Sequence, residues 1–276
     1  MKIKFLGTGG SEAIPALFCR CEVCEKARRN KGREIRSRAS TLIDGKVMID
    51  FSPDTFYHAT YMDFDLTAIS SLLITHSHSD HFYPEDILMR TSYATFNRTE
   101  EILHVYGNSA IMQGFDRVGY EKMKVVSKNT LLHSIENEKS FEVEGITVTP
   151  LETLHMCKED CYIYLLQKDG KNYLHVSDSD IPKERVCKYI EDKKIRLDAV
   201  SMDCTYGIME NNFGGHMDIR KNKIFIQRLK EIGAADENTK FYAIHISHVA
   251  GDIEKLEKEA EKIGLTLAYD GLEIEI

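Results

Sequence analysis

The distribution of apolar and polar positions predicts many short strands in the first two thirds of the chain. Apolar runs bounded by glycine or polar residues indicate strands at 2–6, 40–43, 46–51, 69–74, 103–106, 124–126, 141–150, 161–167 and 171–176. Two of the intervening turns, Asp44-Gly45 and Asp169-Gly170, have the composition of tight hairpin turns. Loops that connect strands are therefore expected in the early part of the chain.

In the last third, strand patterns alternate with helical ones. Strands are predicted at 199–202 and 240–246, and helices at 221–232 and 253–263. This alternation is typical of layered α/β proteins. No repeat, low-complexity tract or polar linker interrupts it, so we expect one domain over residues 1–276, in which helices face two mixed sheets.

The pattern is least regular over residues 89–123. The aromatic side chains in and near this segment are Tyr93, Phe96, Tyr106, Phe115 and Tyr120. Aromatic residues more often pack in a core than line a ligand pocket. The sequence leaves the role of this segment open.

The composition argues against several classes of function. The formal net charge is −8 at pH 7 and the pI is about 5.8, so no field of the whole protein attracts nucleic acid or an anionic membrane. No apolar run approaches the roughly 20 residues of a membrane span, and we expect a cytoplasmic protein. The cysteines number seven, and an odd count in a reducing compartment favours metal binding over a disulfide framework.

Residues 75–81 are the most informative part of the chain. They read Thr-His-Ser-His-Ser-Asp-His and directly follow a predicted strand. Imidazole and carboxylate groups suit zinc, manganese or iron. The spacing predicts that His76 and His78 bind one ion, while Asp80 and His81 point at a second. The alternative is a polar loop that happens to be rich in histidine.

A site for two ions needs further donors, and three candidates stand at predicted strand ends. His155, Asp178 and His245 each follow an apolar strand run, where loops gather into sites. The two oxygens of Asp178 could bridge both ions. Each residue alone is more often structural, but their combination with the 75–81 loop favours a shared metal site.

The cysteines at the N-terminal end form a second candidate site. Cys19, Cys21 and Cys24 have a spacing that can fill three corners of a tetrahedral zinc site, and His248 is the candidate fourth ligand. Three unligated cysteines in a loop are the alternative. The remaining cysteines lack such spacing and are interpreted as buried small hydrophobes: Cys157, Cys161, Cys187 and Cys204.

The order His-x-His-x-Asp-His, then His, Asp and His, resembles the metallo-β-lactamase superfamily over nearly the whole chain. The resemblance implies a four-layer αββα sandwich of two mixed β-sheets flanked by helices, with a two-metal site at one edge. It assigns His76, His78 and His155 to one ion, Asp80, His81 and His245 to the other, and Asp178 between them. The 7–10 loop and Asp50 also fit family positions near the site.

A narrower resemblance comes from the Cys-x-Cys-x2-Cys run, the His245-x-x-His248 pair and the ending at 269–274. Together they resemble the PhnP group, phosphoribosyl 1,2-cyclic phosphate phosphodiesterases. The resemblance gives His248 to the structural Zn2+ and His216 a catalytic role. His216 could instead cap the helix that follows it or face solvent. The PqqB-like group also carries the cysteine run.

These resemblances imply a dinuclear metal-dependent phosphodiesterase. Two Mn2+ or Zn2+ ions would activate a hydroxide that attacks a small cyclic phosphodiester such as a phosphoribosyl 1,2-cyclic phosphate. Asp80, Asp178 and His216 are the expected catalytic residues. A PqqB-like protein, an iron-dependent oxidoreductase, a non-catalytic zinc module and an RNA-processing nuclease are the alternatives. The nuclease is disfavoured because the basic stretches 26–38 and 221–230 look like solvated faces. The sequence does not decide which metal is bound, which substrate is used or whether the chain forms a homodimer.

Overall fold

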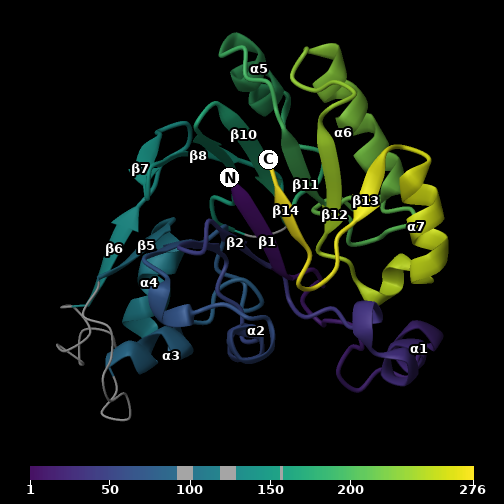
Figure 1. Ribbon diagram of the computed structural model, residues 1–276, viewed down its shortest axis with the longest axis horizontal. Coiled ribbons are helices and arrows are strands. Elements are labelled where there is room, and N and C mark those ends of the chain that lie inside the picture. The colour runs from purple at the N-terminus through teal and green to yellow at the C-terminus, as the bar shows by residue number, and fades with distance from the viewer. Residues whose placement is uncertain (92–101, 119–128, 156–157) are drawn as a thin grey trace.

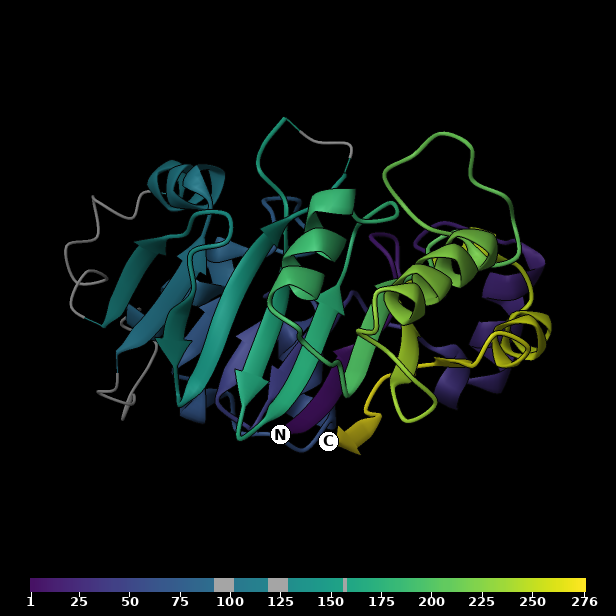
Figure 2. The same cartoon turned by 90° about the horizontal axis from the view of Figure 1, so that it is seen from above.

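The computed structural model describes residues 1–91, 102–118, 129–155 and 158–276 (Figure 1). The strand predicted at 124–126 and the residues Tyr93, Phe96, Tyr120 and Cys157 lie outside this part of the chain. The described residues form two β-sheets packed face to face, with helices on the outer faces (Figures 1 and 2). No helix among them is long and apolar enough to cross a membrane.

The first sheet is mixed. Its strands, in spatial order, are β14 (Glu273–Glu275), β1 (Lys2–Gly7), β2 (Ser40–Ile43), β3 (Val47–Ile49), β4 (Ser71–Leu73), β5 (Leu103–Gly107) and β6 (Thr130–Ser134). The pairs from β14 to β3 are antiparallel, and those from β3 to β6 are parallel. Strands β3 and β4 therefore end at the same edge.

The second sheet is also mixed. Its order is β13 (Leu265–Leu267), β12 (Lys240–Ile244), β11 (Ala199–Asp203), β10 (Lys171–Val176), β9 (Tyr162–Lys168), β8 (Ile146–Glu152) and β7 (Phe141–Val143). The pairs from β13 to β10 are parallel, and the remainder are antiparallel. Consequently β8, β10, β11 and β12 all run in one direction, and their carboxyl ends meet at one edge of the sheet.

Helices cover both outer faces. They are α1 (Glu22–Asn30), α2 (Thr55–Tyr61), α3 (Pro84–Ile87), α4 (Ser109–Arg117), α5 (Glu184–Asp192), α6 (Ile219–Glu231) and α7 (Ile253–Glu261). Helices α5, α6 and α7 bury apolar side chains against the second sheet, and α3 and α4 bury theirs against the first. A third apolar cluster lies between the sheets. Three apolar layers separate four layers of structure, and the predicted αββα sandwich is confirmed.

The pleat of the strands explains why three layers can form. In β10, Tyr173 belongs to the cluster between the sheets, whereas Leu174 and Val176 belong to the cluster beneath the helices. Successive side chains of a strand point to opposite faces. A strand covered on both faces therefore reads as a continuous apolar run, which is the pattern that the sequence showed.

Most predicted elements agree with the structure, but the run at 141–150 does not. It is a hairpin of β7 and β8, turning at Glu144 and Gly145, which both have positive φ. Apolar residues on both sides of this short turn hid it from the sequence pattern. The sequence also did not predict β6, β13 and β14, nor the helices α1 to α5. Phe115 packs in the core beneath the first sheet, the commoner of the two fates considered for the aromatic residues.

Candidate metal centre

Two groups of donor side chains meet at the edge where the strands of both sheets end. The first group comprises His76, His78, His155 and Asp178, and the second comprises Asp80, His81, Asp178 and His245. Within each group, one ligand atom of every member lies within 4.8 Å of those of the others. The two groups contain all seven donors that the sequence predicted, and they share Asp178.

The carboxylate of Asp178 faces both groups at once. Its Oδ2 lies 3.7 Å from the Nε2 atoms of both His76 and His155. Its Oδ1 lies 2.7 Å from Nε2 of His245 and 3.2 Å from Nε2 of His81. The side chain is only 3% exposed. This is the geometry of a carboxylate that can bridge two ions.

The backbone is strained at three of the strand ends. Asp50, Asp178 and His245 have φ values of 63°, 41° and 56°. Left-handed backbone costs residues other than glycine about 1 kcal/mol each, and such strain is concentrated at functional sites. At these positions the backbone leaves the regular strand conformation, so the three side chains need not follow the alternation of the strands.

The donors fit divalent ions. The Nε2 atoms of His76, His81 and His245 are buried and make no hydrogen bond within the part of the chain that the structure describes. Bonds of about 2.1 Å at angles between tetrahedral and octahedral put neighbouring ligand atoms roughly 3.0–3.4 Å apart. The contacts between donors in the two groups, 2.7–3.7 Å, span this range. Asp178 Oδ1 lies near two of these nitrogens, 3.2 Å from that of His81 and 2.7 Å from that of His245, but without the geometry of a hydrogen bond. Buried imidazole nitrogens that lack a hydrogen bond are costly, and a bound cation would satisfy them.

In four of the five histidines of the two groups, one ring nitrogen has a hydrogen-bond partner outside the groups. The partners are Thr75 Oγ1 for His76 (3.0 Å), Asp50 Oδ2 for His81 (2.7 Å), the Gly215 carbonyl for His155 (3.1 Å) and Thr205 Oγ1 for His245 (2.9 Å). Such partners fix the orientation and the tautomer of a metal-binding imidazole. Asp50, which the sequence placed at a family position near the site, orients His81 in this way.

Electrostatics prepare the two groups differently. Burial lowers the pKa of His76 and of His155, so both rings are neutral and can bind a cation. Burial also opposes the charged form of His245, but Asp178 outweighs it and raises the pKa of His245 to about 10 in the metal-free protein. A cation entering the second group must therefore displace a proton, which makes binding weaker in acid.

His216 lies beside these groups and is paired with a carboxylate that the sequence analysis missed. Its Nδ1 lies 2.7 Å from Asp203 Oδ2, and its ring stacks on that of His245 at 5.5 Å between centroids. The ring is T-shaped against His155 at 4.9 Å. Asp203 is the last residue of β11 and is completely buried. The strand-end signal that identified Asp178 could have identified it.

The loop that carries His216 is fixed by buried polar groups. Asn211 is completely buried and donates to the carbonyls of Gly214 and His216 at 3.1 and 2.9 Å. Lys221 donates to the same His216 carbonyl at 3.1 Å and forms an ion pair with Asp180 at 2.8 Å. The loop lies between β11 and α6, at the upper side of Figure 2. His216 therefore neither caps that helix, which begins after Asp218, nor faces open solvent.

The cysteine cluster forms a separate group with His248. The Sγ atoms of Cys19, Cys21 and Cys24 lie 3.4, 3.4 and 3.6 Å from His248 Nδ1. Tetrahedral zinc with its usual bond lengths separates sulfur and nitrogen ligands by about 3.6 Å. The four residues thus fit one structural zinc ion. Three of the other cysteines are buried, in agreement with their interpretation as small hydrophobes: Cys161, Cys187 and Cys204.

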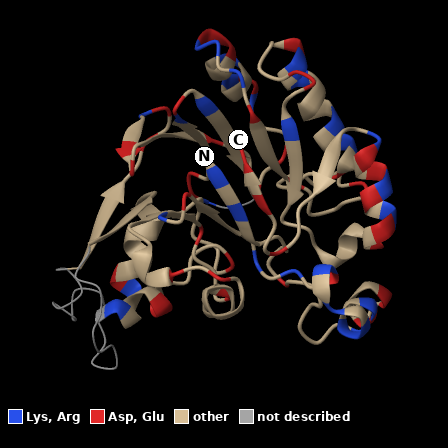
Figure 3. Cartoon of the chain, in the orientation of Figure 1, with Lys and Arg blue, Asp and Glu red and all other residues tan. Residues whose placement is uncertain are grey.

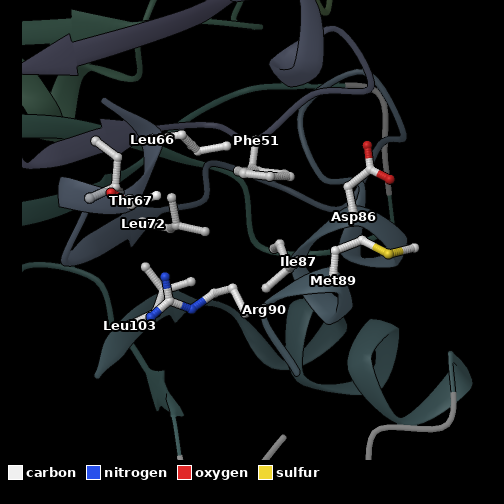
Figure 4. A pocket seen from close by; sticks show the side chains of 10 residues that line it. Phe51, Leu66, Thr67, Leu72, Asp86, Ile87, Met89, Arg90 and Leu103 are labelled. Atoms are coloured by element: carbon white, nitrogen blue, oxygen red, sulfur yellow. The ribbon is translucent and has the colours of Figure 1, made fainter. Parts of the chain in front are cut away.

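An apolar cavity of about 230 Å³ lies away from both metal groups (Figure 4). Its lining includes Leu66, Ile69, Ile87 and Leu103, which belong to or pack against the apolar cluster between the first sheet and its helices. None of the predicted metal donors lines it, so it does not bear on the chemistry of the site.

Comparison with known proteins agrees with the geometry. The family model of the beta-lactamase superfamily domain matches residues 46–246. Among curated proteins, the chain is similar to an octanoyltransferase of Porphyromonas gingivalis (strain ATCC BAA-308 / W83), with 29% identity over 163 residues. The match covers 56% of this chain and 31% of the relative, so the chain spans about a third of that protein's length.

Several solved structures share the fold over the whole chain. A diphosphatase from the PhnP family has a TM-score of 0.76 at 21% identity, covering 100% of this chain and 98% of its own. Zinc-bound PqqB from Methylobacterium extorquens has a TM-score of 0.77 at 17% identity, covering 100% of both chains. The short form of human tRNase Z has a TM-score of 0.69 at 15% identity, and the match covers 100% of this chain and 99% of its own.

The family model spans most of the chain and includes every donor of the two groups. The fold of the solved relatives is the fold predicted from the order of those donors. The chain therefore belongs to the beta-lactamase superfamily and has the metallo-β-lactamase fold.

Proposed function

We propose that this enzyme hydrolyses a small phosphodiester, such as a phosphoribosyl 1,2-cyclic phosphate, with water as the nucleophile. The observation that carries the proposal is the His216–Asp203 pair, which lies directly against the ligand His245 of the two-ion site. A phosphodiester needs charge stabilisation at phosphorus and a proton for its leaving oxygen. Ions in the two donor groups would supply the charge stabilisation, and the His216–Asp203 pair would supply the proton.

The ligands would be His76, His78 and His155 for one ion and Asp80, His81 and His245 for the other, with Asp178 shared. When bound there, two Mn2+ or Zn2+ ions would acidify water and offset the charge that develops on the phosphoryl oxygens. The order of affinities among divalent metals does not by itself select one of them.

His216 is the proposed proton donor. Asp203 accepts a hydrogen bond from its Nδ1, which leaves Nε2 as the atom that can pass a proton to the leaving oxygen. Burial lowers the pKa of His216, but Asp203 and Asp178 outweigh it and hold that pKa above its ordinary value. The protonated ring is thereby favoured. Asp203 also accepts from the backbone of Met217 and Thr205, so its orientation is fixed.

The surface supports a small substrate over a nucleic acid. Acidic and basic side chains are interspersed along α5, α6 and α7 (Figure 3). Basic residues of both stretches considered earlier are paired: Lys26 with Asp252 and Glu254, and Arg228 with Glu184. The net charge of −8 adds no attraction for a polyanion. The likeness to a diphosphatase from the PhnP family also favours small phosphate compounds.

The test is a substrate panel with protein reconstituted separately with Mn2+ and Zn2+. It contains bis(p-nitrophenyl) phosphate, a phosphoribosyl 1,2-cyclic phosphate, a small diphosphate ester and a single-stranded RNA. We expect the highest kcat/KM for the cyclic phosphodiester. The comparison variants are His216→Asn and, as a matched control, His133→Asn on the edge strand β6. Preference for the diphosphate ester or for RNA would refute the proposed substrate, and no turnover by either metal form would refute phosphoester hydrolysis.

A further inference from the structure

Glu159 reaches from the loop between β8 and β9 to the metal-binding loop of the other sheet. Its Oε1 accepts hydrogen bonds from the backbone nitrogen of Ser77 at 3.1 Å and from the Ser77 hydroxyl at 2.5 Å. Its Oε2 accepts one from the side chain of Asn108 at 2.6 Å. Ser77 stands between His76 and His78, so Glu159 holds the residue that separates two of the predicted ligands.

The contact with Asn108 extends this connection into the first sheet. Asn108 is buried and follows β5, and its Oδ1 accepts from the backbone nitrogens of Ala110 and Ile111 at the start of α4. Its amide also donates to the carbonyl of Asp160 at 2.6 Å. One carboxylate is therefore anchored on a fixed helix terminus and on the ligand loop at the same time.

We propose that Glu159 is a positioning residue for the ion of the first group. That ion takes His76 and His78 from one loop and His155 from another, and Glu159 belongs to the loop of His155. The distance of 3.2 Å between His155 Nε2 and His78 Nδ1 is set by how these two loops meet. This role rests on the proposed ligand set and adds a residue that the sequence analysis did not identify.

The two loops have a second connection that does not involve Glu159. The backbone nitrogen of Tyr162 donates to the carbonyl of Thr75 at 3.1 Å. Loss of the Glu159 side chain therefore leaves the sheets joined next to the site. The expected defect is a loosened ligand geometry, with the fold retained.

The chain offers a matched control at the opposite end of β4. Glu144, in the hairpin turn of the second sheet, accepts from the hydroxyl of Ser70 at 2.8 Å, just before β4 begins. Ser77 follows the same strand on the side of the metal groups. Both contacts join a glutamate of the second sheet to a serine of the first, but only the Glu159 contact lies next to predicted ligands.

The experiment measures metal stoichiometry and affinity in wild type, Glu159→Ala, Glu159→Gln and Glu144→Ala. Each protein is equilibrated with Zn2+ or Mn2+ in a series of chelator buffers and its bound metal is counted, and Co2+ forms are compared by their visible spectra. Removing a side chain that orients metal ligands typically lowers affinity 10- to 100-fold. We expect a loss of this size in Glu159→Ala for one ion only, with a changed Co2+ spectrum.

Glu159→Gln keeps an oxygen acceptor for Ser77, but its NH2 group then faces the NH2 group of Asn108. Its loss of affinity should therefore be smaller than that of Glu159→Ala. Glu144→Ala should bind metal as wild type does. Unchanged affinity in Glu159→Ala, or an equal loss in Glu144→Ala, would overturn the role of Glu159 while leaving the proposed function intact. Wild-type protein that binds no ion besides that of the cysteine group would overturn the proposed function and this role together.

Discussion

Replacing Asp178 by asparagine tests the two-ion site most directly. The carboxylate faces the first group through Oδ2 and the second through Oδ1. Asparagine keeps the shape but has one oxygen and one NH2, so one of the two groups must face N–H donors. In the first group Asp178 is the one carboxylate among the four described donors, and the other three donors are imidazoles. The second group retains the charge of Asp80. The first ion should therefore be affected most.

The magnitude follows from the burial of the site. Asp178 is 3% exposed, and its oxygens lie 2.7–3.7 Å from four imidazole nitrogens. Removing one partner from a buried charge arrangement costs roughly 3–5 kcal/mol. At about 1.4 kcal/mol for each factor of ten, the affinity for the first ion should fall by roughly 100- to 5,000-fold. Turnover of bis(p-nitrophenyl) phosphate should fall at least in proportion to the lost ion.

The assay counts bound metal in chelator buffers and measures turnover in the same samples. The matched control is Asp198→Asn, a half-buried carboxylate that pairs with Lys171 at the far end of the same sheet. The control should retain the wild-type metal content. Wild-type affinity for both ions in Asp178→Asn would refute the bridging role, and an equal loss in the control would show that the effect is general destabilisation.

Three further outcomes follow from other contacts. His216→Asn should lower kcat about 10²- to 10⁴-fold with little change in metal content. Asp203→Asn, which removes the carboxylate paired with His216, should lower kcat less. Unchanged kcat in both variants, measured with saturating metal, would eliminate His216 as the proton donor. Burial lowers the pKa of His58 to about 4 from 6.5. As the pH falls below 6.5, the unfolded state therefore binds a proton at this residue before the folded state does. The stability contributed by neutral His58 is complete above about pH 6.5. By pH 5, urea titrations of metal-free protein should show a loss about 2 kcal/mol larger in wild type than in His58→Gln, and parallel curves for the two proteins would contradict this role of His58. Cys24→Ala should release one zinc ion per chain and lower Tm by about 5 °C, equivalent to ~2 kcal/mol for a chain of this size, whereas retention of that zinc would show that the cysteine group does not bind it.

The sequence was sufficient for the order of the donors and for the fold that this order implies. Buried strands gave short runs rich in apolar residues, and β2 and β10 were predicted with the bounds that the structure gives. The helices α6 and α7 showed the 3.6-residue period because each packs one face on the second sheet. The short strands β13 and β14 gave no comparable signal, because polar residues interrupt both of them and their pairing depends on distant strands.

The sequence by itself determined which residues stand at strand ends, and hence that His76, Asp178 and His245 would be neighbours. Only the tertiary structure decided which oxygen of Asp178 faces which group and which partner holds each ring. Glu159 reaches Ser77 across 82 positions, and Gly215 reaches His155 across 60. Such contacts are fixed when the two sheets pack, because a hydrogen bond requires positions within a few tenths of an ångström that no local pattern encodes. Local periodicity assembles the ligands at one edge, and packing between the sheets orients them.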